Sequence, residues 1–143
     1  MSEKFKTEMP VWIGGIYLKE EGGYEIILKS LTHYKKRLRN IRKSPEIKDA
    51  PMFATIIESE AQKSYQAANN TISKITESLV FPEKLSTIES EIPLIEKALV
   101  CYHTDISKKD TDPFYSELIT DMQMASQDAP KILFALKEIK RYY

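Results

Sequence analysis

Apolar residues recur at spacings of three and four from Tyr24 to the C-terminal end of the sequence. This period places them on one face of an α-helix, the stripe that a helix buries against its neighbours. Four such segments of about 20 to 30 residues follow one another, separated by breaks that contain proline. Short polar connections favour antiparallel neighbours, so the pattern predicts an all-α fold and, more narrowly, an up-down four-helix bundle.

Proline and capping residues mark the ends of these segments. The residue before a proline is disfavoured in the helical region, so the first helix is expected to end at Ser44. Asp112 before Pro113 is the clearest start signal, an N-cap followed by a proline in the first turn. Pro93 and Pro130 lie inside the predicted third and fourth helices, which we expect to be kinked there. For Pro93 the alternative is a short helix followed by a longer one that begins near the proline.

The beginning of the chain follows a different pattern. Residues 11–13 (Val-Trp-Ile) and 16–18 (Ile-Tyr-Leu) are β-branched, aromatic or aliphatic and flank the pair Gly14-Gly15, which is typical of a tight β-hairpin. Two strands alone are marginally stable, so this hairpin would have to dock on the bundle or on another chain. The alternative is an irregular apolar strap in which Trp12 covers one end of the bundle.

All four glycines lie at positions 14, 15, 22 and 23, and none follows Tyr24. The helical part therefore has no Gly-rich phosphate loop, no GxSxG elbow and no EF-hand loop, because each of these needs glycine at a fixed place. The same boundary predicts two parts, a turn-rich apolar appendage at 1–23 and a helical bundle domain at 24–143.

The composition fits a folded chain in a reducing compartment. Of 143 residues, 42% are hydrophobic and 29% are charged, which is enough apolar material for a core. Cys101 is the single cysteine, so no disulfide can form within the chain. The uncharged apolar runs are far shorter than the roughly 20 residues of a membrane span. We therefore expect a cytoplasmic protein that does not bind membranes.

The residues needed for several kinds of metal or nucleophilic chemistry do not occur at the required spacing. A ferritin-like di-iron site needs Glu-x-x-His, but Ser30 and Val100 stand three residues before His33 and His103. Cys101 and His103 are two apart, which points them to different sides of a helix. One cysteine and two histidines are too few for a structural zinc site. We predict no catalytic residue, no metal ligand and no cofactor, and an enzyme is the less favoured class.

Carboxylates are numerous enough to keep one metal-dependent alternative open. Glu117, Asp121 and Asp128 would share one flank of the predicted fourth helix, at i, i+4 and i+11. Acidic bundle faces can bind Mg²⁺ together with a substrate phosphate, although such faces are usually just solvated. A metal-dependent phosphohydrolase built on Glu117 and Asp121 is therefore the lowest of the functional alternatives.

The main charge feature is a basic run at 35–43, in which six of the nine residues are Lys or Arg. Residues 24–48 carry eight basic and two acidic side chains, a net of +6, while residues 51–143 carry ten basic and fourteen acidic ones, a net of −4. This run could pack against acidic helices of the same bundle, meet an acidic protein surface or a second copy of the chain, or contact nucleic-acid phosphates.

The sequence thus predicts a non-enzymatic interaction or scaffolding subunit of a protein complex, with nucleic-acid binding as the alternative. The partner is expected to be another protein or a second copy of the chain. The predicted contact residues are the apolar Trp12, Ile13 and Tyr17 and the basic Lys35, Lys36, Arg37, Arg39, Arg42 and Lys43.

Overall fold

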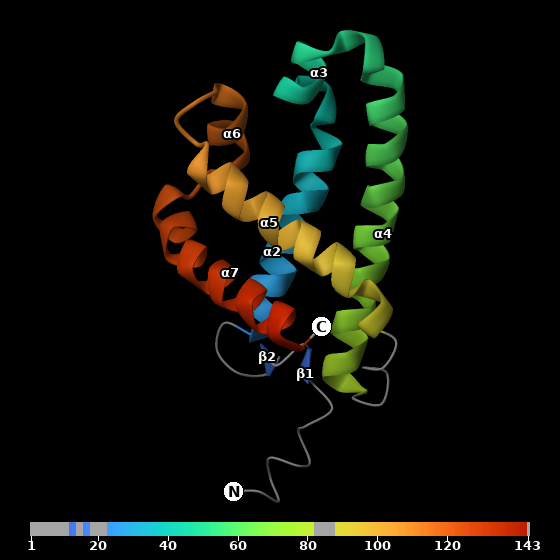
Figure 1. Ribbon diagram of the computed structural model, residues 1–143, viewed down its shortest axis with the longest axis vertical. Coiled ribbons are helices and arrows are strands. Elements are labelled where there is room, and N and C mark those ends of the chain that lie inside the picture. The colour runs from blue at the N-terminus through green and yellow to red at the C-terminus, as the bar shows by residue number, and fades with distance from the viewer. Residues whose placement is uncertain (1–11, 14–15, 18–22, 82–87, 143) are drawn as a thin grey trace, which may run out of the picture.

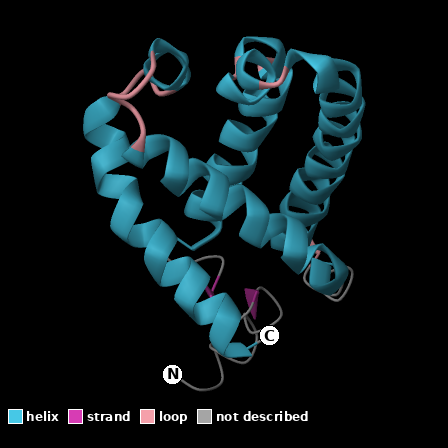
Figure 2. Ribbon diagram, turned by 45° about the horizontal axis from the view of Figure 1, so that its top comes forward, coloured by secondary structure: helices cyan, strands magenta, loops and turns pink. Residues whose placement is uncertain are grey.

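The computed structural model describes residues 12–13, 16–17, 23–81 and 88–142. The elements are the strands β1 (Trp12–Ile13) and β2 (Ile16–Tyr17), the α-helices α2 (Gly23–Arg39), α3 (Pro45–Asp49), α4 (Ala54–Val80), α5 (Ile92–Ser107), α6 (Pro113–Leu118) and α7 (Met122–Tyr142), and the 3₁₀ turns η2 (Ile41–Lys43) and η3 (Pro51–Phe53). Helices make up almost all of the described chain, and the loops between them are short (Figure 2).

The four long helices form two antiparallel pairs, and α2 contacts the other three. Helices α2 and α4 run side by side, while α5 and α7 form a second pair that crosses α2 obliquely (Figure 1). The predicted all-α class is confirmed. An up-down four-helix bundle is not specifically supported, because the described residues form six α-helices and the second pair lies across the first.

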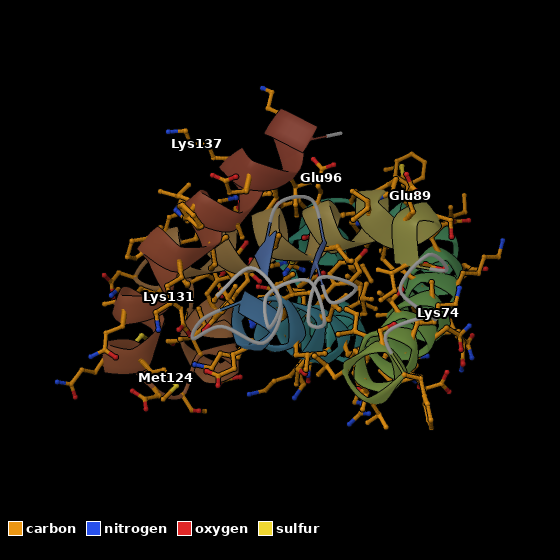
Figure 3. The ribbon with its side chains drawn as sticks, turned by 90° about the horizontal axis from the view of Figure 1, so that it is seen from below. Lys74, Glu89, Glu96, Met124, Lys131 and Lys137 are labelled. Atoms are coloured by element: carbon orange, nitrogen blue, oxygen red, sulfur yellow. The ribbon has the colours of Figure 1, made fainter. Side chains whose placement is uncertain are left out.

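The core is built from the predicted apolar stripes. Residues with no more than 2% exposure come from each long helix: Ile27 and Leu31, Ile75, Ile95 and Leu99, and Ile132 and Ile139. On α4 the buried positions are mostly small, including Ala61 and Ala68, which lets α2 approach closely. Charged side chains such as Lys137 and Glu89 project from the outside of the helices (Figure 3). Among the described helices, none combines the length and apolar character of a membrane-spanning segment.

Two helix ends differ from their predicted places. The first helix ends at Arg39, and a 3₁₀ turn at 41–43 follows, so the chain leaves the α-helix before Ser44. The predicted fourth helix is divided into α6 and α7 by residues 119–121. Its start signal is confirmed, because the side chain of Asp112 accepts a hydrogen bond from the backbone N–H of Phe114 at 2.8 Å.

Pro93 lies differently from the expected kink. Pro93 is in the first turn of α5, where a proline removes no helical hydrogen bond, so this residue begins a helix and does not kink one. This matches the alternative of a helix that begins near the proline. Pro130 lies inside α7, which continues as one helix from Met122 to Tyr142.

Of residues 1–22, the structure describes only two short strands, while Gly23, the last residue of the predicted appendage, begins α2. β1 and β2 pair antiparallel, with Trp12 opposite Tyr17 and Ile13 opposite Ile16. β2 contacts α2 and α7. The rest of residues 1–22, including the glycine pair predicted to form the turn, lies outside the described residues.

Candidate functional site: a buried polar network around α2

One face of α2 carries polar residues at a spacing of four, Lys29, His33 and Arg37. Residues four apart lie one above the other on a helix, so this stripe runs along α2. It faces α5 and α7, which each supply one buried acid, Asp105 and Asp128. Buried ionic groups need partners, and here each acid meets side chains of the α2 stripe.

Asp105 is the centre of the first set of contacts. His33 donates from Nε2 to Asp105 Oδ2 at 2.7 Å, and Arg37 donates from Nε to the two carboxylate oxygens at 3.0 and 3.3 Å. The side chains of His33 and Asp105 are 7% and 2% exposed, and that of Arg37 is 12% exposed. Arg37 and Asp105 thus form a buried ion pair, to which His33 adds a hydrogen bond, and these contacts join α2 to α5.

Arg37 also connects this pair to the short helices. Its guanidinium donates to Glu46 of α3 and lies over the rings of Phe114 and Tyr115 of α6, at 5.2 and 5.8 Å. Burial alone would lower the pKa of Arg37, but the hydrogen bond to Glu46 and the negative charges of Asp105 and Glu46 raise it above its ordinary value. Arg37 is therefore a permanent cation inside the fold.

Asp128 is the centre of the second set. Tyr102 of α5 donates its hydroxyl to Asp128 at 2.9 Å, and Lys29 donates to the other carboxylate oxygen at 3.3 Å. Burial, followed by the bond to Asp128, raises the pKa of Tyr102 above its ordinary value. The Tyr102 ring also stacks on His33, with ring centroids 4.7 Å apart, so the two sets are in contact.

A pocket of about 490 Å³ opens beside this network. One wall is formed by α2 and includes Lys29 and His33, and the other includes Tyr102, Asp128 and the link between α6 and α7. Lys36 reaches across it and donates to the carbonyl oxygen of Leu118 at 2.8 Å. The pocket gives solvent a route to the edge of the network at His33.

Cys101 lies one turn before Asp105 on the same face of α5. Its thiol donates to Asp105 Oδ2 at 3.8 Å. Burial and the nearby Asp105 charge raise the pKa of this thiol to about 12, so it is protonated at neutral pH. Because the thiolate is the nucleophile of cysteine enzymes, this arrangement is not an activated nucleophile.

The predicted basic contact residues are largely paired within the chain. Arg37 is buried in the network, and Lys36 is bonded to a backbone carbonyl. Arg42 forms an ion pair with Glu58 of α4 at 2.9 Å. Lys43 is exposed on η2. The run thus faces partners in its own fold at several positions and solvent at others.

Lys35 and Arg39 meet a tyrosine of α4. Each cation lies 5.3 Å from the ring centroid of Tyr65, and Arg39 also donates to the Tyr65 hydroxyl. That hydrogen bond lowers the pKa of Tyr65. For the apolar contact residues Trp12, Ile13 and Tyr17 the structure gives only the backbone pairing, and their side chains lie outside the described residues.

The three acids expected on one flank of the fourth helix lie in different places. Glu117 is on α6, whereas Asp121 lies in the link and accepts a hydrogen bond from the Met124 N–H at 2.9 Å, capping α7. Asp128 is buried against Lys29 and Tyr102. The prediction of a shared flank was wrong because the helix is interrupted at 119–121.

Within the described part of the chain, one group of three side chains could hold a metal ion: His33, Cys101 and Asp105. Sequence reasoning missed this group because it compared Cys101 with the nearby His103, whereas the histidine whose ligand atom lies within 4.8 Å of the Cys101 sulfur is His33, on another helix. The available signal was the i, i+4 spacing of Cys101 and Asp105 on an otherwise apolar face.

Comparison with protein-family models, with curated proteins and with solved structures found no significant match to this chain.

Proposed function

We propose that the chain is a non-enzymatic interaction or scaffolding subunit of a cytoplasmic protein complex. The observation that carries this proposal is an apolar patch where η3 leads into α4. Met52, Phe53 and Ile56 are 82%, 50% and 63% exposed, and they fall within five consecutive residues. We call these three residues the 52–56 patch.

Exposed apolar side chains in one place favour burial against another protein. Each square ångström of apolar surface removed from water contributes about 25 cal/mol, and contiguous apolar patches commonly mark interaction sites. The patch is flanked by exposed charges of both signs, Lys48 and Asp49 before it and Glu60 after it. An apolar centre with a charged rim is the usual anatomy of a protein interface.

Because basic residues of the 35–43 run already have acidic partners within the fold, we favour an apolar contact with the partner protein over an ionic one. Arg37 and Arg42 have acidic partners within the fold, so these two cations are already neutralised locally. Trp12, Ile13 and Tyr17 remain predicted contact residues that could extend an apolar surface from the N-terminal part.

Light scattering on the purified chain tests the proposal. If the chain associates with itself, light scattering should show a defined oligomer. If the partner is another protein, cross-linking should capture a single protein, and that protein should bind the chain again after purification. The triple variant Met52→Gln/Phe53→Gln/Ile56→Gln should weaken association more than about tenfold, a loss of roughly 1.4 kcal/mol. Val80→Gln is the matched control, since Val80 is 67% exposed at the other end of α4. A wild-type chain that stays monomeric and rebinds no partner, or a triple variant that associates like the wild type, would refute the proposal.

Nucleic-acid binding is a second candidate, favoured by one surface feature. Arg39 and Arg42 line a groove of about 400 Å³ between α2 and α4 that also contains Tyr65. Single-stranded nucleic acids are commonly held by aromatic rings that stack bases, next to cations that meet phosphates. Arg39→Glu/Arg42→Glu should abolish binding of a labelled RNA at low salt, while Lys63→Glu on the exposed side of α4 should not. Absence of any shift for the wild type at low salt would exclude this candidate.

A further inference from the structure

We propose that His33, Cys101 and Asp105 form a binding site for one divalent transition-metal ion, with zinc(II) as the natural occupant. One ligand atom of each residue lies within 4.8 Å of the other two. Imidazole nitrogen, thiolate sulfur and carboxylate oxygen are the three donors that zinc uses in proteins. The side chains of His33 and Asp105 are almost fully buried, and Cys101 is half-buried, so the site is largely shielded from water.

The distances suit tetrahedral zinc after a small adjustment. Zinc bonds of about 2.3 Å to sulfur and 2.1 Å to oxygen or nitrogen place a sulfur and an oxygen ligand about 3.6 Å apart, and an oxygen and a nitrogen ligand about 3.4 Å apart. Cys101 Sγ lies 3.8 Å from Asp105 Oδ2, close to the first value. His33 Nε2 lies 2.7 Å from the same oxygen, so these two atoms must move apart by about 0.7 Å to admit the ion.

The helices already hold the three side chains in place. Cys101 and Asp105 are four residues apart, on successive turns of one face of α5, and His33 faces them from α2. Arg37 Nε bonds to both oxygens of Asp105 and so fixes the plane of the carboxylate. The Tyr102 ring stacks on His33 and restricts the imidazole. Supporting contacts of this kind orient metal ligands and strengthen binding.

The charges balance when the ion binds. Zinc displaces the thiol proton of Cys101 into solvent and forms a bond to the thiolate. The proton on His33 Nε2 exchanges through solvent to Nδ1, so the neutral imidazole binds the ion through Nε2. The two positive charges of the ion then meet the negative charges of Cys101 and Asp105. The cation of Arg37 keeps Glu46 as its own partner. A buried site without excess charge avoids the desolvation cost of an unpaired ion.

The pocket beside α2 supplies access and a fourth ligand. His33 and Tyr102 line this cavity of about 490 Å³, so an ion can reach the imidazole from solvent. A site with three protein ligands keeps its fourth tetrahedral position for a water molecule.

Cobalt(II) is the probe of choice, because its bond to a thiolate gives a near-ultraviolet charge-transfer band and tetrahedral coordination gives visible bands. The chain has one cysteine, so the charge-transfer band reports on Cys101. The full chain, stripped of metal and kept reduced, is titrated with Co²⁺. We expect the bands to saturate at one equivalent and to disappear on adding Zn²⁺. Zinc should also raise the thermal unfolding midpoint.

Two ligand variants and one matched control decide the outcome. Cys101→Ser should remove the charge-transfer band, and His33→Gln should weaken cobalt binding by about 100-fold or more. His103→Gln, which changes the other histidine, should bind like the wild type. Circular dichroism identifies a variant that fails to fold, and the wild-type titration then decides alone. Each of three results would refute the proposed site. The wild type could show no thiolate band at saturating cobalt, folded His33→Gln could bind cobalt with wild-type affinity, or His103→Gln could lose as much affinity as His33→Gln.

Discussion

Removing the charge of Asp105 tests whether the buried network behaves as an interior ion pair. Asp105→Asn keeps the shape of the side chain but replaces one oxygen that accepts from Arg37 or His33 with an NH₂ group. The side chain is 2% exposed and that of Arg37 is 12% exposed, so water is a poor replacement for the lost contacts. Of its two carboxylate partners, Arg37 would keep only Glu46, whose side chain is 46% exposed.

The expected loss is large because breaking a buried pair leaves an uncompensated charge. Such changes typically cost about 3 to 5 kcal/mol. The unfolding entropy of a chain of 143 residues is about 0.3 kcal/mol/K, so the thermal midpoint should fall by about 10 to 17 °C. Urea denaturation, followed by circular dichroism in the presence of a chelator, measures the free energy of unfolding without any metal contribution.

Glu58→Gln is the matched control for this substitution. It makes the same change from acid to amide opposite an arginine of the same basic run, Arg42, but the arginine side chain there is 81% exposed. An exposed pair contributes about 0 to 1 kcal/mol, so the control should remain close to the wild type. Equal losses in the two variants would refute the assignment of Asp105 and Arg37 as a buried pair.

Three smaller perturbations test individual contacts. Tyr102→Phe should cost about 1 to 3 kcal/mol, because buried Asp128 loses a donor, and an unchanged urea midpoint would contradict this. Asp112→Ala should cost about 1 kcal/mol through the lost helix cap, whereas Asp112→Asn should keep most of it. Because the bond from Arg39 lowers the pKa of Tyr65, the Tyr65 phenol should ionise at a lower pH in the wild type than in Arg39→Gln. Titration of tyrosinate absorbance measures this, with Tyr65→Phe identifying the contribution of Tyr65. Identical curves for the wild type and Arg39→Gln would disprove the prediction.

The apolar stripes could be predicted from the sequence because burial on a helix imposes a fixed period. Ile27, Leu31, Ile95 and Leu99 follow this spacing of three and four, and all of them are fully buried. Pro93, which was expected to kink the third helix, lies in the first turn of α5. The crossing of the two helix pairs could not be predicted in this way. An apolar stripe says that a helix is covered on one side but not at which angle its neighbour lies.

The interruption at 119–121 was missed because local signals pointed elsewhere. Pro130 drew attention as the expected kink of the fourth helix, and it lies exposed inside α7. The actual break follows Leu118 and includes Ile119, both buried. Asp121 then caps the new helix. Leu118 and Ile119 are both buried because of how α6 packs in the fold. A periodic pattern along the sequence does not contain this tertiary information.

The polar stripe of α2 explains how one arrangement of the helix pairs is selected. An apolar seam of isoleucine and leucine specifies register less strictly than buried polar residues do, and the next register along a helix lies one turn away, about 5.4 Å. The same slide would separate Arg37 from Asp105 and Lys29 from Asp128, leaving two buried acids without their cations. We infer that the network fixes the register of α5 and α7 on α2. Arg37→Met/Asp105→Leu should therefore cost less stability than Asp105→Asn alone while broadening the side-chain NMR signals of α5, because apolar contacts replace the pair without specifying its position.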